Sequence, residues 1–262
     1  MIVEFIGCDG AGKTTLSRML GEPGVLEGRA VAMADLVLDR PGLRGITHST
    51  AVNVVQEVGS LPFLIRAYRR QRAYLAFTRR IHARYAPSTY DRLNGMRGIA
   101  RRVGMYELAK SRAADRIVLS DEGTVLSAYL FALTDVELDR SDVERFAELV
   151  PRPEKIVYVK APIASLVRRA TIRHDPRRQH LGKDRSEIER TIRRTVDVFD
   201  LVADDSALRD RVLVVENDDD DLGHMSQLVD ELAIAVLPLL AADDVEVRST
   251  ARASTDLLRP EL

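Results

Sequence analysis

Residues 2–15 read "IVEFIGCDGAGKTT", an apolar run that passes directly into a glycine-rich segment. The apolar run has the length and β-branched composition of a buried strand. Gly7, Gly12, Lys13 and Thr14 fit the spacing G-x-x-x-x-G-K-[ST]. Backbone amides of such a segment cradle phosphates when a strand precedes it and a helix follows it. The stretch therefore predicts a phosphate-binding loop at the end of a first strand.

The residue types of this loop predict individual contacts with a nucleotide. Lys13 is expected to reach the β- and γ-phosphates, the Thr14 hydroxyl to ligate Mg²⁺ and Thr15 to bond the α-phosphate. The helix that starts near Lys13 adds the partial positive charge of its N-terminus. The loop residues expected to bind the cofactor are Gly7, Asp9, Gly10, Ala11, Gly12, Lys13, Thr14 and Thr15.

Composition favours a single globular enzyme-sized domain. The chain has 262 residues, of which 45% are hydrophobic and 30% charged, with a net charge of -1. This suits one domain over 1–242 followed by a polar tail over 243–262. The single cysteine, Cys8, excludes a disulfide framework. Met1 runs directly into the first strand, so we expect no leader segment, and the longest apolar run is too short to cross a bilayer. We therefore expect a soluble, cytoplasmic protein.

Short β-branched runs alternate with helical patterns along the chain. Such alternation predicts an α/β fold with a parallel sheet of about five strands and helices on both faces. The candidate strands are 2–6, 29–35, 116–120, 155–161 and 211–216. Combined with the glycine loop, this predicts a P-loop NTPase architecture.

Two segments interrupt the alternation. Residues 45–112 have helical periodicity and little strand character, and Pro62, Pro87 and "LNGMRG" at 93–98 are expected to divide them into pieces. We expect this helical insertion to lie over the carboxyl edge of the sheet. Residues 174–185 contain proline and glycine between two helical patterns, which is typical of a mobile lid.

An acidic pair follows the strand at 116–120. Asp121 at the tip of that strand is expected to hold Mg²⁺ or to accept a proton, and Glu122 to polarise an attacking hydroxyl or water. The structural alternative is that both acids only cap the helical pattern that begins at Thr124, since acids favour a helix N-terminus.

Arginines gather at two places downstream of the loop. Arg169 and Arg173 are four residues apart and share a helix face beside the lid, where guanidinium groups can stabilise a transferring phosphoryl group. A solvated basic helix end is the alternative. The region 66–112 is also basic and includes Arg97 and Arg101. It can attract an anionic acceptor, bind nucleic acid or form a solvated or partner-facing surface.

With these residues in hand, the chain resembles the thymidylate kinase-like branch of the P-loop nucleoside monophosphate kinases. "FIGCDGAGKTT" looks like the family's first strand and loop, including Asp9. "LDRPG" at 38–42 is similar to its acceptor-side segment and nominates Arg40. "VYVKAPIASLVRRATIR" at 157–173 resembles its fourth strand and lid helix, and "VVEND" resembles its last strand and adenine-side loop, around Asn217.

The resemblance implies ATP and Mg²⁺ as cofactors and a kinase activity, with Lys13, Asp121, Glu122, Arg169 and Arg173 in the reaction. Two departures leave the acceptor open. Glu122 stands where the family has an arginine, and the insertion at 45–112 is longer and more basic than a thymidylate-binding segment.

Two functions therefore follow from the sequence. The first is a kinase that moves the ATP γ-phosphoryl to an anionic or hydroxyl-bearing small molecule, with Asp9, Arg40, Arg97 and Arg101 as acceptor-side residues. The second is an ATP-hydrolysing or nucleotide-sensing switch that acts on a partner protein. Nucleic-acid and membrane binding are not expected, and a homodimer is left open.

Overall fold

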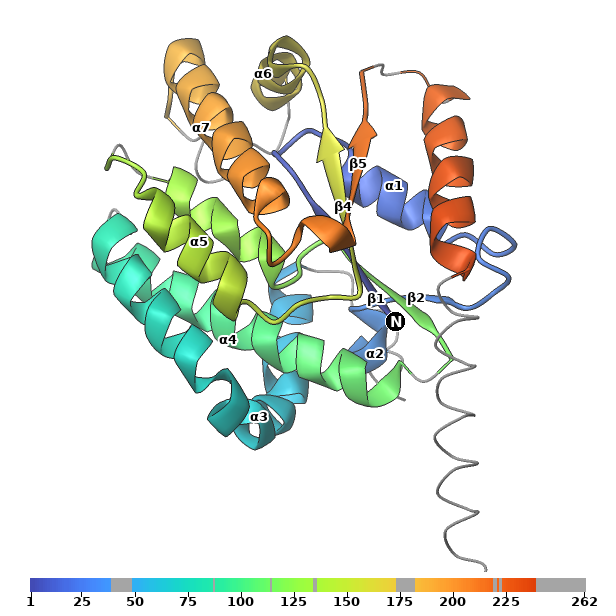
Figure 1. Ribbon diagram of the computed structural model, residues 1–262, viewed down its shortest axis with the longest axis horizontal. Helices are drawn as coiled ribbons and strands as arrows, with labels where there is room; N and C mark the ends of the chain where they lie inside the picture. The colour runs from blue at the N-terminus through green and yellow to red at the C-terminus, as the bar shows by residue number, and fades with distance from the viewer. Residues whose placement is uncertain are drawn as a thin grey trace, which may run out of the picture.

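The central sheet is parallel throughout. The computed structural model describes residues 1–38, 49–86, 88–113, 115–133, 136–172, 182–218, 221 and 223–238. The strands are β1 (Ile2–Ile6), β2 (Ala30–Ala32), β3 (Ile117–Ser120), β4 (Lys155–Lys160) and β5 (Val212–Glu216), in the spatial order β2-β3-β1-β4-β5 (Figure 1). Every pairing between neighbours is parallel. The predicted α/β fold with five parallel strands is confirmed.

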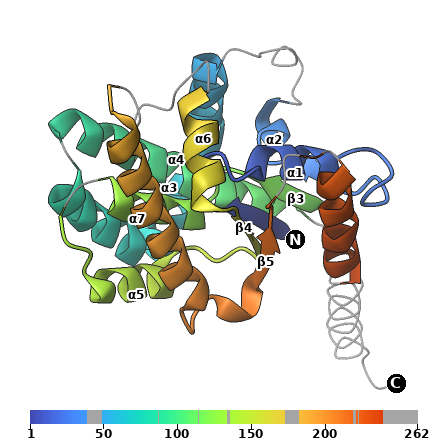
Figure 2. The same cartoon turned by 90° about the horizontal axis from the view of Figure 1, so that it is seen from above.

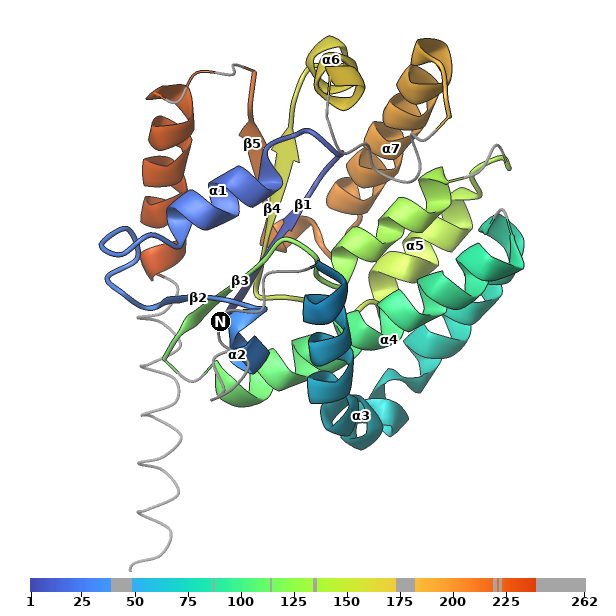
Figure 3. The ribbon, with the colours of Figure 1, turned by 180° about the vertical axis from the view of Figure 1, so that it is seen from behind.

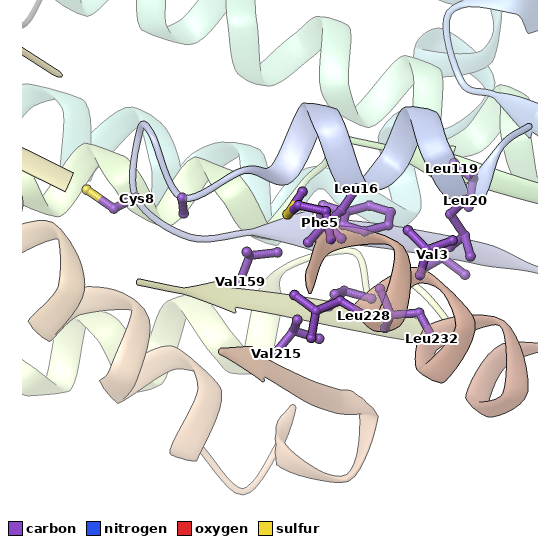
Figure 4. Packing of buried hydrophobic residues seen from close by; sticks show 14 of the residues in the cluster. Val3, Phe5, Cys8, Leu16, Leu20, Leu119, Val159, Val215, Leu228 and Leu232 are labelled. Carbon is purple, nitrogen blue, oxygen red and sulfur yellow. The ribbon is translucent and has the colours of Figure 1, made fainter. Parts of the chain in front are cut away.

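Helices cover both faces of the sheet, as the complete burial of the inner strands β1 and β3 requires. Val3 and Phe5 point to one face, where α1 (Lys13–Leu20), α6 (Ile163–Ile172) and a helix over 223–238 pack. Figure 4 shows Leu16 of α1 beside Phe5, and Leu228 of the last helix and Val159 of β4 belong to the same cluster. Successive strand side chains alternate between faces, so Ile2 and Ile6 point to the other.

The second face is covered by the helices that follow β2. These are α3 (Ser49–Tyr85), α4 (Thr89–Arg112), the 3₁₀ helix η1 (Val125–Ala132) and α5 (Arg140–Leu149). Figure 2 shows α3 and α4 on one side of the sheet and α1 and the 223–238 helix on the other. The remaining helices are α2 (Asp35–Leu38), α7 (Arg185–Asp204) and the short 3₁₀ helix η3 (Arg209–Arg211). α7 contributes Ile188 to the first face and Phe199 to the second.

Of the breaks predicted within 45–112, those at Pro62 and at 93–98 were wrong, whereas the chain does break between the end of α3 at Tyr85 and the start of α4 at Thr89. α3 runs through Pro62, and "LNGMRG" lies inside α4, so the one interruption between them is the connection around Ala86 and Ser88. Figure 3 shows α3 changing direction between its blue first part and its teal second part, the response expected of a helix with an internal proline. The Cα of Gly95 packs so close to His82 that a Cβ there would lie 2.2 Å from its Nε2. Gly95 therefore serves the contact between α3 and α4 and does not end a helix.

The end of the proposed lid is ordered helix. Asp184 caps α7 and its side chain accepts hydrogen bonds from the backbone amides of Ser186 and Glu187, while the Asp184 amide donates to Oε2 of Glu187. Residues 184–185 therefore belong to α7, and 174–181 lie outside the described residues. Among the helices that the structure describes, none is both apolar and long enough to cross a bilayer.

Candidate functional site

The glycine loop, residues 7–12, lies where the strand order reverses. β1 pairs with β3 on one side and β4 on the other, and ligands of open parallel sheets bind beyond the carboxyl ends of strands at such a point. A cavity of about 1270 Å³ opens there. Its walls come from the glycine loop, from α3 and α4, from Asp121 and Glu122, and from η1.

The loop has a backbone that requires glycine. Gly7, Gly10 and Gly12 all have positive φ angles, of 131°, 84° and 101°. A Cβ on Gly7 would lie 2.3 Å from the carbonyl oxygen of Val159 in β4. Burial raises the pKa of the Cys8 thiol to about 12, so this side chain stays protonated and packs as a small apolar group. The loop is therefore a tight turn pressed against β4.

Two cations contact the backbone of this loop. The Lys13 ammonium donates to the carbonyl oxygens of Gly7 and Cys8, each at 2.8 Å. Arg169 of α6 donates from Nη1 to the carbonyl oxygen of Gly10 at 2.8 Å. Arg169 therefore reaches the loop from α6, 159 residues away in sequence, whereas its predicted contact with a phosphate stays a prediction.

The predicted metal ligands are neighbours. Thr14 Oγ1 donates to Asp121 Oδ2 at 2.9 Å, which joins the start of α1 to the end of β3. Mg²⁺ prefers oxygen ligands and is usually held by one or two protein groups together with phosphates and water. A hydroxyl beside a carboxylate at the mouth of the glycine loop fits that donor set. No cluster of three or more His, Cys, Asp or Glu side chains suited to a metal occurs within the described ranges.

The capping alternative for the acidic pair has no support in the structure. The N-cap of η1 is Thr124, and its first turn contains no acid. The Glu122 carboxylate instead pairs with Nη2 of Arg101 at 2.8 Å. Arg101 also donates to Oδ1 of Asn53 on α3. Glu122 thus connects the end of β3 to α4 directly, through Arg101, and Arg101 extends the connection to Asn53 of α3.

The other sequence-predicted residues of the cavity lie on its two walls. Asp9 and Thr15 line it from the loop side, and Arg97 lines it from α4. Arg97 is paired with Glu57 of α3, with Nε 3.0 Å from Oε1. Both predicted acceptor-side arginines of α4 therefore have a carboxylate partner.

Asn217 supports the loop from below. Its side chain is 3% exposed and does not line the cavity. Nδ2 donates to the carbonyl oxygen of Ala11 at 2.7 Å, and the backbone amide donates to Lys160 in β4. Gly12 is required beside it, because a Cβ there would lie 2.6 Å from Nδ2. Asn217 therefore holds the loop in shape, whereas its predicted contact with a cofactor stays a prediction. Arg40 and Arg173 lie outside the described residues.

The sequence reasoning missed four residues of this site. Arg102 of α4, His82 of α3 and Lys183 before α7 all line the cavity, and Glu4 is a buried carboxylate of β1 behind it. A signal was available for Glu4, because it is the one charged residue within "IVEFI". Arg102 and His82 carried no such signal, since both belong to helices rich in arginine and polar residues.

Glu4 lies under the segment that carries the acidic pair. Oε1 accepts from the Leu126 amide at 2.7 Å, and Oε2 accepts from the Thr124 hydroxyl at 3.3 Å. A Cβ on Gly123 would lie 2.2 Å from the Glu4 carboxyl carbon. Burial raises the pKa of Glu4 to about 7, against the lowering effect of these hydrogen bonds and of Arg102. Glu4 thereby anchors the chain immediately after Glu122.

His82 is neutral on the same wall. Its Nδ1 lies 2.8 Å from the Thr78 carbonyl oxygen, to which it donates. Burial lowers the pKa of His82, and the neighbouring charges of Arg102 and Arg92 lower it further. The unprotonated Nε2 faces Gly95 across the helix contact.

Comparison with known proteins adds no family to these observations. No protein-family model matches the chain, and no curated protein matches it.

Proposed function

We propose that this protein is a P-loop kinase that uses ATP and Mg²⁺ to phosphorylate a small acceptor, in the manner of the nucleoside monophosphate kinases that its sequence resembles. One observation carries the proposal. The Thr14–Asp121 pair, 2.9 Å apart, stands between the glycine loop and the polar helices α3 and α4 in one continuous cavity. A donor and an acceptor can therefore meet at Asp121.

The donor end would be formed by the loop and its cations. The loop leads into the N-terminus of α1, which begins at Lys13, so backbone amides there would donate to phosphate oxygens. Lys13 sits over the loop through its bonds to Gly7 and Cys8, within reach of phosphates in the same turn. Bound ATP and Mg²⁺ would supply the γ-phosphoryl group and the metal charge that neutralises it. Thr14 and Asp121 would hold the metal.

The chain's own residues would orient and stabilise the transfer. Asp121 can also accept the proton of an acceptor hydroxyl, because it stands at the boundary of the two ends. Arg169, bonded to the Gly10 carbonyl, brings a guanidinium to the loop from α6, where it can stabilise charge on the transferring group. The side of the cavity between α3 and α4 would hold the acceptor away from water.

A hydrolysing switch is the weaker alternative. It would need Glu122 to activate water, but the Glu122 carboxylate is already bound to Arg101 at 2.8 Å. The cavity also extends well beyond the loop into a wall of α3 and α4 side chains, which hydrolysis of ATP does not require. Both features favour a second substrate.

Release of ADP tests the proposal directly. We expect slow release from ATP and Mg²⁺ alone and a large rise on addition of one member of a panel of nucleosides, nucleoside monophosphates, sugars and sugar phosphates. Lys13→Ala should abolish the rise. Steady release that no acceptor stimulates would contradict the kinase and support the switch.

A further inference from the structure

The first half of α3 exposes a row of apolar side chains. They recur at intervals of four and three residues, so they lie along one side of the helix. Each is between 50% and 68% exposed, and none of them lines the cavity. Single exposed apolar residues are ordinary, but a contiguous row of them marks a binding surface. We call this row the apolar stripe; it consists of Val54, Val58, Leu61, Ile65 and Tyr68.

Arginines accompany the apolar stripe on the exposed surface of α3. Among residues 51–85, every exposed side chain is either apolar or an arginine. Three of the arginines are paired, Arg70 with Glu107 and both Arg80 and Arg84 with Asp142. The other exposed arginines have no carboxylate within 4.0 Å in the part of the chain that the structure describes. We call them the arginine group; they are Arg66, Arg69, Arg72 and Arg79.

The charges of this surface decide between its potential occupants. The one acid of α3, Glu57, is paired with Arg97 and lines the cavity. A second copy of the chain would place the same face of α3 against itself, so the second α3 would offer no carboxylate to the arginine group. Nucleic acid would offer phosphates but no apolar surface for the aliphatic side chains. The occupant that complements both features is apolar and anionic at once.

The position of α3 makes this surface accessible to a large, extended partner. The apolar stripe lies on both sides of Pro62 in the sequence. Figures 1 and 3, which view the molecule from opposite sides, both show the bend of α3 as the lowest part of the coloured ribbon. The exposed side chains of α3 therefore lie at an edge of the described molecule.

We propose that the apolar stripe and the arginine group bind the surface of an anionic lipid bilayer. Helices with an apolar and an arginine-rich surface lie in the boundary between headgroups and acyl chains. The aliphatic side chains of the stripe enter that boundary, and Tyr68 stays at the level of the headgroups, which suit its ring and its hydroxyl. The arginines contact headgroup phosphates and carboxylates while their alkyl stems cover apolar surface.

This mode of binding differs from the one that the sequence argued against. A helix that lies on a bilayer does not cross it, so the shortness of the apolar runs in this chain does not oppose it. The proposal replaces the expectation that the protein does not bind membranes. It is separate from the proposed kinase activity, because the cavity is lined by other residues.

Sedimentation with lipid vesicles tests the proposal. The full chain is mixed at low ionic strength with vesicles of phosphatidylcholine alone, or of phosphatidylserine and phosphatidylcholine in equal amounts. We expect binding to the mixed vesicles to be at least about tenfold stronger, because each arginine near an anionic surface raises binding about fivefold. Failure of the wild type to bind the mixed vesicles, or equal binding to both kinds, would overturn the proposal.

Two double variants separate the apolar stripe from the arginine group. Val58→Ser with Ile65→Ser removes two exposed aliphatic side chains and should weaken binding to the mixed vesicles at least about tenfold. Arg69→Gln with Arg72→Gln should weaken it about twentyfold. The proposal requires both features, so binding that survives either double variant overturns it.

Matched controls change similar residues elsewhere on the surface. Ile234→Ser alters an exposed aliphatic residue of the 223–238 helix, and Arg140→Gln with Arg145→Gln removes two exposed arginines of α5. Both should bind the mixed vesicles as the wild type does. Since every substituted side chain is exposed, unchanged near-UV circular dichroism is expected and shows that each variant is folded. Equal losses in the controls would overturn the assignment to α3.

Two further measurements identify the occupant if the vesicles fail. Sedimentation velocity without lipid detects self-association, and polyuridylate is the nucleic-acid probe. Self-association that is lost in Val58→Ser with Ile65→Ser, without vesicle binding by the wild type, would make the stripe an interface between copies. Binding of polyuridylate that is lost in Arg69→Gln with Arg72→Gln, again without vesicle binding, would make the arginine group a nucleic-acid surface. Either result overturns the proposal.

Discussion

The two walls of the cavity are built in different ways. The loop wall consists of consecutive residues whose backbone makes the contacts, with glycines at φ angles that other residues rarely adopt. The helical wall consists of side chains from α3 and α4, held by ion pairs such as Arg97–Glu57 and Arg101–Glu122. A site built from backbone amides favours an anionic ligand group such as phosphate. A side-chain site can change its specificity with single substitutions.

The two walls also differ in how they are connected to the ends of the strands. Lys13, Thr14 and Arg169 all bond to the loop or to the strand end beside it, so hydrogen bonds hold these three side chains against the loop wall. The helical wall is joined to the strand ends through Glu122 and, behind it, through Glu4. Glu122 and Glu4 therefore lie between the two walls, and substitution of either one would remove a connection between the helical wall and the strand ends.

Removal of the lysine of the loop wall should have the largest effect on turnover. Lys13→Ala is expected to lower kcat by about a thousandfold, the upper range for loss of one charge-stabilising donor. Near-UV circular dichroism should be unchanged, because the bonds that the ammonium donates to Gly7 and Cys8 lie within the loop and not in the apolar core. Lys110→Ala, on an exposed part of α4, is the control. Turnover close to wild type in Lys13→Ala would contradict the proposal that the loop binds phosphates.

The boundary residue Asp121 should have the next largest effect. Asp121→Asn keeps the acceptance of the Thr14 hydroxyl but removes the charge, and kcat is expected to fall about a hundredfold. A steeper requirement for Mg²⁺ in steady-state kinetics would assign the loss to the metal, and an unchanged requirement would assign it to proton transfer. Asp210→Asn, in exposed η3, should match wild type. Unaltered kcat and Mg²⁺ dependence together would leave Asp121 with no catalytic part.

The helical wall should respond as a coupled pair. Arg101→Gln and Glu122→Gln are each expected to lower kcat/KM for the acceptor about tenfold, and the double variant should be little worse than either, because contacting residues are not additive. KM for ATP should hardly change. The exposed pair Arg193–Glu189 on α7, with its atoms 2.6 Å apart, provides the matched double-variant control. Additive losses would mean that the two residues act separately.

Glu4 should affect stability more than turnover. Its pKa is raised from 4.5 to about 7 in the folded protein, so the folded state holds the proton more tightly. The resulting stabilisation is complete below pH 4.5 and is lost as the pH rises through about 7. Glu4→Gln should flatten the fall in unfolding free energy over that range, by about 3 kcal/mol at most. Urea unfolding at pH 5 and pH 8 measures it, with exposed Glu144→Gln as control. An unchanged slope would contradict the raised pKa.

Much of the fold could be predicted because its signals are local. Each strand is a short β-branched run, and strands alternating with helices leave few arrangements other than a parallel sheet. The helical hairpin was predicted less well. The low helix propensity of Pro62 and of the glycines at 93–98 predicted breaks, but α3 and α4 continue through them. In α4, Gly95 packs against His82 and Gly104 against Ser60, and these contacts keep the helix continuous. Tertiary contact outweighs intrinsic propensity of this size.

The sequence by itself determined the glycine loop and the identity of its neighbours Lys13, Thr14 and Asp121. A phosphate cradle needs consecutive residues, and the acid follows its strand directly, so both leave a pattern along the chain. Only the tertiary structure decided which arginines of α4 are neutralised. Arg97, Arg101 and Arg102 are alike in sequence, but their partners Glu57 and Glu122 come from α3 and from the end of β3. Helix packing distributes those partners in space, and for this reason Arg102, whose Nε is buried without a hydrogen-bond partner in the described chain, could be distinguished from the other two only in the folded chain.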